Sequence, residues 1–147
     1  MYRNILIAMD GSKTALKAAK HGINIAKSCG AKVYAMNVID FKTFSKIPKY
    51  STWARMYEQS NTTGLEILSY VDELGKAAGV AVEKVVLEGN PAQVIVNFAS
   101  GNSIDLIVIG TVGLTGWKHA LLGSVAEKVV RTSICPVTVV PEGFLEI

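Results

Sequence analysis

The sequence predicts an α/β protein in which one open, doubly wound sheet of parallel strands carries helices on both faces. Half of its 147 residues are hydrophobic, enough for a full core and too many for a disordered chain. Short runs rich in Val and Ile alternate with longer segments of helical periodicity. Several of these runs lack the apolar–polar alternation of a half-exposed strand, as expected where helices cover both faces of a sheet.

Five apolar runs are the predicted strands: Ile5–Met9, Val33–Ile39, Ala81–Leu87, Ile104–Ile109 and Val137–Val140. The third run carries Glu83 and Lys84, so we expect it at the outside of the sheet. Each strand but the last is followed by a helix, and right-handed crossovers between parallel strands then give a doubly wound sheet. No linker or internal repeat interrupts the pattern, so residues 1–147 are expected to form a single domain.

Four segments have helical periodicity and are the predicted helices: about 12–29, 63–78, 91–101 and 124–133. Thr63-x-x-Glu66 and Ser124-x-x-Glu127 have the spacing of capping boxes at the starts of the second and fourth. The stretch from Asp40 to Asn61 is predicted as a long loop, and such loops often serve as lids or binding loops. It interleaves basic and aromatic residues, which we expect to pack on the domain rather than bind nucleic acid.

Charge and hydropathy exclude several classes of protein. The formal net charge is +3, from 15 basic and 12 acidic residues, too weak by itself to indicate a nucleic-acid partner. No apolar run approaches the ~20 residues of a membrane span. The apolar stretch near the N-terminus ends too early, at Asp10, to be a secretory signal. We therefore expect a cytoplasmic protein without a nucleic-acid or membrane partner.

Glycines follow the fourth strand, where an open α/β sheet binds its ligands. Gly110, Gly113, Gly116 and Gly123 precede the last predicted helix, which begins near Ser124. Glycines let backbone N–H groups approach a ligand, and a helix N-terminus attracts anions, so the segment suits a phosphate. Alternatively the glycines only form turns and Ser124 caps its helix. The sequence has neither a Walker motif nor Gly-x-Gly-x-x-Gly, which disfavours P-loop and ordinary dinucleotide-binding proteins.

Asp10 follows the first strand, at the same edge of the predicted sheet. Its carboxylate has the chemistry to accept hydrogen bonds from a ribose or to hold a phosphate-bound Mg²⁺ through water. An equally good explanation of Asp10-Gly11-Ser12 is that Asp10 and Ser12 cap the first helix. The spacing does not separate these alternatives.

The glycine motif also carries a resemblance. Gly110-x-x-Gly113, nine further residues and Gly123-Ser124 resemble the nucleotide-binding motif of the universal stress protein family. The likeness spans the chain: residues 5–12 resemble the family's first strand and turn, and 37–40 the end of its second strand. Residues 122–129, followed by Cys135-Pro136-Val137, resemble its closing block. One departure is Val112, where many relatives carry a polar or basic residue.

The resemblance implies the strand order 3-2-1-4-5 and an ATP site between the first and fourth strands. Backbone near Ala8 and Val38 would hold the adenine, with Asp10 beside the ribose and phosphates. Mg²⁺ would be held mainly through phosphates and water. The residues implied to bind the nucleotide are Ala8, Met9, Asp10, Val38, Ile109, Gly110, Gly113, Gly123, Ser124 and Val125.

The last strand region, residues 132–141, contains no charged residue. In the implied strand order it lies at an edge, and an uncharged apolar edge invites pairing with another chain. Because members of the similar family dimerise through this strand, we expect a homodimer paired antiparallel through Val137, Thr138, Val139 and Val140. The alternative is that residues 142–147 cover the edge.

Three functions remain from the sequence. The favoured one is an ATP-binding regulator or sensor, since no residue pattern favours catalysis: the only histidines are His21 and His119, and no nucleophile elbow is present. The second is a slow ATP hydrolase in which Asp10 or His119 orients water beside Mg²⁺. The third is a dimeric interaction module that binds no nucleotide.

Overall fold

The strands and helices alternate along the whole chain, as the sequence predicts. The computed structural model describes residues 1–40, 42, 50–111 and 122–145, with only the backbone of residues 50–53. The elements are β1 (Asn4–Ala8), α1 (Lys13–Cys29), β2 (Lys32–Ile39), α2 (Tyr50–Ala78), β3 (Val82–Glu88), α3 (Pro91–Gly101), β4 (Leu106–Gly110), α4 (Ser124–Thr132) and β5 (Val137–Val140). All neighbouring strands are parallel, in the order β3-β2-β1-β4-β5. The α/β fold class and the implied strand order are confirmed.

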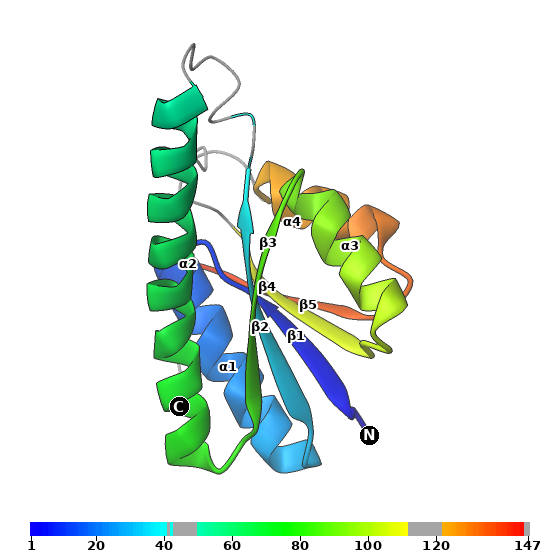
Figure 1. Ribbon diagram of the computed structural model, residues 1–147. Coiled ribbons are helices and arrows are strands. Elements are labelled where there is room, and N and C mark those ends of the chain that lie inside the picture. The colour runs from blue at the N-terminus through cyan, green and yellow to red at the C-terminus, as the bar shows by residue number, and fades with distance from the viewer. Residues whose placement is uncertain (41, 43–49, 112–121, 146–147) are drawn as a thin grey trace.

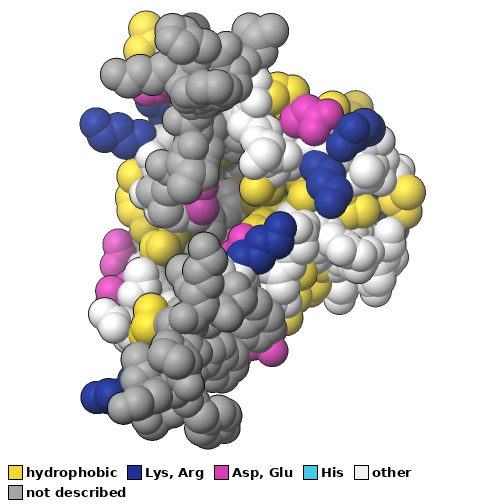
Figure 2. Space-filling model, turned by 90° about the horizontal axis from the view of Figure 1, so that it is seen from above, with side chains coloured by type: hydrophobic (Ala, Val, Ile, Leu, Met, Phe, Trp, Pro, Cys, Tyr) yellow, Lys and Arg dark blue, Asp and Glu magenta, His cyan; other side chains and the backbone are white. Residues whose placement is uncertain are grey.

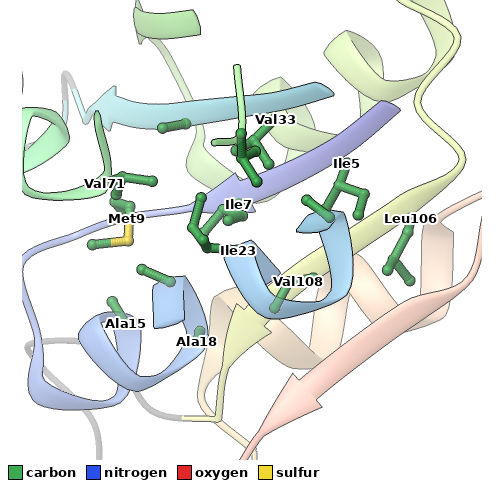
Figure 3. Close-up of a cluster of buried hydrophobic side chains, with 14 of the residues drawn as sticks. Ile5, Ile7, Met9, Ala15, Ala18, Ile23, Val33, Val71, Leu106 and Val108 are labelled. Atoms are coloured by element: carbon green, nitrogen blue, oxygen red, sulfur yellow. The ribbon is translucent and has the colours of Figure 1, made fainter. Parts of the chain in front are cut away.

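The sheet lies between two helical layers, with α1 and α2 on one face and α3 and α4 on the other (Figure 1). Ile7, Ile23 and Val71 belong to the core beneath α1 and α2, drawn in Figure 3. Leu6 and Val129 belong to the core beneath α3 and α4. Ile5, Leu6 and Ile7 are all inaccessible to solvent, which explains why the first strand is apolar at consecutive positions. No helix in the described part of the chain is long and apolar enough to cross a bilayer.

The winding direction reverses at β1. The chain moves outward from β1 to β2 and β3, with α1 and α2 as the crossovers, and then returns to β4 on the other side of β1. Ala8 pairs with Met36 at the end of β1, and Ile7 with Val108 of β4. The chain segments that leave β1 and β4 therefore diverge above the carboxyl ends of these strands, where such sheets bind ligands.

Both edges of the sheet carry the strands expected there, β3 and β5. The tail after β5 turns toward α1: the Phe144 ring packs edge-on against His21 at 5.1 Å, and Lys17 Nζ donates to the backbone oxygen of Glu142. In the described part of the tail, the only backbone bond to a preceding residue runs from Phe144 N–H to Pro141 O, at 3.1 Å. These residues therefore add no strand to the edge of β5.

The prediction of an irregular stretch from Asp40 to Asn61 is wrong, because α2 already begins at Tyr50. Thr63 lies inside this helix and does not cap it. The neighbouring Thr62 also lies inside the helix, where its Oγ1 donates to Glu58 O at 3.0 Å. Gly64 permits close packing on β2, since a Cβ atom there would lie 2.6 Å from Asn37 Oδ1.

Candidate functional site

A cleft of about 820 Å³ opens above the carboxyl ends of the strands, between the starts of α3 and α4. Figure 2 views the molecule from above and shows hydrophobic, acidic and basic side chains exposed together on this side. Apolar residues that line the cleft include Ala8, Met36, Val38, Ala92, Ile95 and Ile109. The charged residues that line it are Asp10, Asp40, Lys42, Glu127 and Lys128. The cleft has the size and the mixed lining of a small-molecule site.

The structure brings nine of the ten residues implied by the resemblance to this cleft: Ala8, Met9, Asp10, Val38, Ile109, Gly110, Gly123, Ser124 and Val125. They come from β1, β2, β4 and α4 and from the segments that follow or precede these elements. The tenth, Gly113, lies outside the described residues, as do Val112, Gly116, Lys118 and His119. These segments converge because β1 lies between β2 and β4 in the sheet.

The backbone of Val38 faces the cleft beyond the end of β1. Met9 N–H donates to Met36 O at 2.8 Å, and Gly89 N–H donates to Ile39 O at 2.9 Å. Since backbone groups of a strand point alternately to its two neighbours, Val38 N–H and C=O face the β1 side. The next acceptor on that side is Met9 O, and it accepts a hydrogen bond from the side-chain amide of Asn37 at 2.8 Å. A donor and an acceptor of Val38 are thus left at the edge of the cleft.

Asp10 and Ser12 shape the turn between β1 and α1. Asp10 Oδ1 accepts a hydrogen bond from Ser12 N–H at 2.9 Å, and Ser12 Oγ accepts one from Ala15 N–H at 3.2 Å. Ser12 is therefore the N-cap of α1. The Asp10 carboxylate has a structural role in the turn, and the residue also lines the cleft. The capping explanation applies to Ser12, whereas Asp10 combines a turn with a place in the cleft.

Gly110 ends β4 where α1 approaches most closely. A Cβ atom at this position would lie 2.8 Å from Thr14 Oγ1 and 2.9 Å from the backbone carbon of Thr14. Real Cβ atoms essentially never come so close to other atoms. Packing of α1 against the floor of the cleft is thus sufficient reason for a glycine here, independent of any ligand.

The start of α4 corrects the prediction that Ser124 caps this helix. Gly123 is the N-cap, with an extended backbone (φ −66°, ψ 162°), and no side chain of the described residues caps the helix. The first intrahelical bond runs from Glu127 N–H to Gly123 O at 2.9 Å. The N–H groups of Ser124, Val125 and Ala126 precede it, and residues in this position have no intrahelical acceptor. Gly123 N–H itself donates to Thr111 O and is not available to a ligand.

The other two helices that begin at the cleft are already capped. Asn90 Oδ1 accepts from Gln93 N–H at 3.2 Å at the start of α3, where Pro91 has no N–H to offer. Ser12 caps α1 in the same way. Among these three starts, α4 alone has no side-chain cap in the described residues, so all three of its first-turn amides are left for a ligand, and it offers the best site for an anion.

Sequence reasoning missed the wall formed by α3 and the lysine of α4. Asn90, Pro91 and Ile95 line the cleft, whereas the sequence predicted only that a helix spans about 91–101. Lys128 also lines it. Its signal was present, because Lys128 follows Ser124 by four residues and such residues share one face of a helix.

Among the described residues, no group of three or more His, Cys, Asp or Glu side chains is arranged to hold a metal ion.

Comparisons with known proteins agree with this architecture. The family model described as "Universal stress protein family" matches residues 1–141. A universal stress protein of Methanocaldococcus jannaschii is 45% identical over 140 residues, which cover 95% of this chain and 82% of that protein. Hypothetical protein MJ0577 has a solved structure with a TM-score of 0.90 and 28% identity, covering 99% of both chains. A universal stress protein solved in complex with cAMP has a TM-score of 0.70 and 28% identity, covering 95% of this chain and 97% of its own. The chain belongs to the universal stress protein family.

Proposed function

We propose that this protein binds an adenine nucleotide, ATP with Mg²⁺, in the cleft and acts as a nucleotide-dependent regulator in the cytoplasm. The observation that carries the proposal is the pairing of two backbone sites across one cavity. Val38 offers a donor and an acceptor at one wall, and the uncapped start of α4 offers three amides at another. A solved relative, 28% identical to this chain, holds cAMP, which supports an adenine nucleotide as the ligand.

The base fits the Val38 side of the cleft. Adenine presents an acceptor, N1, beside a donor, the N6 amino group, and the N–H and C=O of Val38 complement this pair. Ala8, Met36 and Ile95 supply apolar surface for the faces of the ring. The phosphates would then extend toward Ser124, Val125 and Ala126, whose amides and helix dipole favour negative charge.

A divalent cation fits the acidic side of the cleft only with help from the phosphates. Asp10 lines the cleft, and one oxygen of its carboxylate already accepts from Ser12 N–H. Mg²⁺ commonly takes one or two carboxylates and several waters, and the substrate phosphates complete its coordination. We therefore assign Asp10 a contact to the ion through water, and the nucleotide the direct ligands.

The nucleotide that the purified protein retains tests this function. Protein prepared without added nucleotide is heat-denatured, and the released compounds are identified by chromatography. ATP at near-stoichiometric yield supports retention without turnover, whereas ADP would favour a slow hydrolase. No adenine nucleotide released, and no binding at millimolar concentration, would overturn the proposal in favour of an interaction module.

Gly123→Val tests the position of the phosphates. The backbone of Gly123 is extended and accepts a β-branched residue without strain, so the fold should persist. The added methyl groups stand at the start of α4, and we expect loss of ATP binding in calorimetry. Gly101→Val in α3 is the matched control, since no atom lies within 4 Å of the added Cβ. Wild-type affinity in folded Gly123→Val protein would place the phosphates elsewhere.

We further propose that two copies pair through β5. This strand is an edge of the sheet, and the described tail contacts α1 instead of extending the sheet. Its residues are Val137, Thr138, Val139 and Val140, none of which carries the charge that commonly protects an edge strand from pairing. An antiparallel pair would join the two sheets and leave both clefts open.

A further inference from the structure

One lysine of the cleft lies on the same helix as the uncapped amides. Lys128 follows Ser124 by four residues, a rise of about 6 Å along the axis, and both residues line the cleft. The Cα–Cβ bonds of a helix tilt toward its N-terminus, so the stem of Lys128 starts toward the first turn of α4. A lysine stem is long and flexible enough to place its charge beside an anion bound there.

The acidic neighbour of Lys128 is engaged elsewhere. Glu127 Oε2 lies 3.5 Å from an Arg131 guanidinium nitrogen, one turn toward the C-terminal end of α4. In the described part of the chain Lys128 itself forms no ion pair. The charge of Lys128 therefore remains available on the wall that carries the amides.

The second lysine of the cleft is placed differently. Lys42 follows β2, and its N–H donates to Asp40 Oδ1 at 3.0 Å. Both residues line the cleft close in sequence to Val38, on the side assigned to the base. Of the two described lysines that line the cleft, Lys128 is thus nearer to the proposed phosphate site.

We propose that Lys128 determines the phosphate preference of the cleft, favouring the β- and γ-phosphates of ATP over a nucleotide with a single phosphate. The inference rests on the proposed nucleotide site. Three amides of α4 suffice for one phosphate, as in AMP or cAMP. Mg²⁺ neutralises part of the added charge of a triphosphate, and the described side chains lining the cleft include three carboxylates against two lysines, so a lysine beside the phosphates supplies further positive charge.

The test is Lys128→Met, which keeps an unbranched stem and removes the charge. Dissociation constants for ATP, ADP, AMP, cAMP and adenosine are measured by calorimetry, with and without Mg²⁺. We expect ATP affinity to fall about tenfold, the loss of one charge-assisted hydrogen bond. Adenosine affinity should not change, and the affinities for AMP and cAMP should change less than those for ADP and ATP. Lys128→Arg should preserve most of the preference for ATP.

Lys20→Met, at an exposed position of α1 away from the cleft, is the matched control and should bind ATP as the wild type does. An equal loss for adenosine and ATP in Lys128→Met would show a structural effect and overturn the inference. Unchanged ATP affinity in Lys128→Met would also overturn the inference. In both cases wild-type binding of ATP leaves the proposed function intact, whereas wild-type protein that binds none of the five ligands overturns both.

Discussion

Gly110→Ala tests whether the floor of the cleft is held in place by the contact between β4 and α1. The added Cβ would approach Thr14 Oγ1, Cβ and backbone carbon to 2.8–2.9 Å, about 0.5 Å short of ordinary contact. One of these atoms belongs to the helix backbone, so a change of rotamer at Thr14 does not remove the clash. The helix or the end of β4 must move, and we expect a loss of about 1–3 kcal/mol in the free energy of unfolding.

Thermal unfolding followed by circular dichroism measures this loss. For a chain of this length, 1 kcal/mol corresponds to about 2–4 °C in Tm, so Gly110→Ala should lower Tm by about 2–12 °C. Gly101→Ala is the control: no atom lies within 4 Å of its Cβ, and we expect an unchanged or slightly higher Tm. Thr14→Ala removes Oγ1 but keeps the Cβ and backbone carbon that the added methyl group also meets, so combining it with Gly110→Ala should restore at most part of the stability. A wild-type Tm for Gly110→Ala would refute the packing argument.

Two further predictions concern the edge strand and pH. Ile107 N–H and Thr111 N–H donate to Pro136 O and Val140 O, so Val139 faces the free edge and Val139→Pro removes no bond to β4. It should yield folded monomers in light scattering, and a persistent dimer would locate the interface elsewhere. The hydrogen bond to Glu88 raises the pKa of Tyr57 above its usual value of 10.0, so the stability it contributes is complete below pH 10 and lost as pH rises through the raised pKa. Wild type and Tyr57→Phe should therefore converge in Tm above pH 10, and a constant difference would mean that the bond contributes nothing.

Much of the fold follows from periodicity, because burial on both faces leaves a clear pattern in strands. Ile5, Leu6 and Ile7 are consecutive and fully buried, so they predict a central strand without any knowledge of its neighbours. Glu83 and Lys84 mark β3 as an edge for the complementary reason. The strand order itself came from the resemblance, since periodicity reports which faces are covered and not which strands are adjacent.

The sequence-based predictions were wrong or incomplete where tertiary contacts override the local conformational preference of the residues. Thr63-x-x-Glu66 has the spacing of a capping box, yet α2 begins at Tyr50 and runs through it, and Gly64 lets the helix approach β2 closely. Asn37 is a polar residue inside an apolar strand, and only the structure shows that its amide takes the carbonyl of Met9. This exchange leaves the backbone of Val38 facing the cleft. A side-chain amide that donates in place of a backbone N–H leaves no periodic pattern in the sequence, so this feature could not be predicted.

The start of α4 has a weaker N-cap than the two neighbouring helices, and this difference bears on the proposed nucleotide site. Ser, Thr, Asn or Asp at the N-cap stabilises a helix by a few tenths of a kcal/mol over Gly, and by about 1 kcal/mol over Ala. The two neighbouring helices have such caps in Ser12 and Asn90, whereas α4 has Gly123. A capping side chain at this position would accept from the same amides that a phosphate needs, so it would compete with the ligand. The small stability forgone at Gly123 therefore agrees with the proposed nucleotide site, because among α1, α3 and α4 only α4 has no side-chain cap in the described residues.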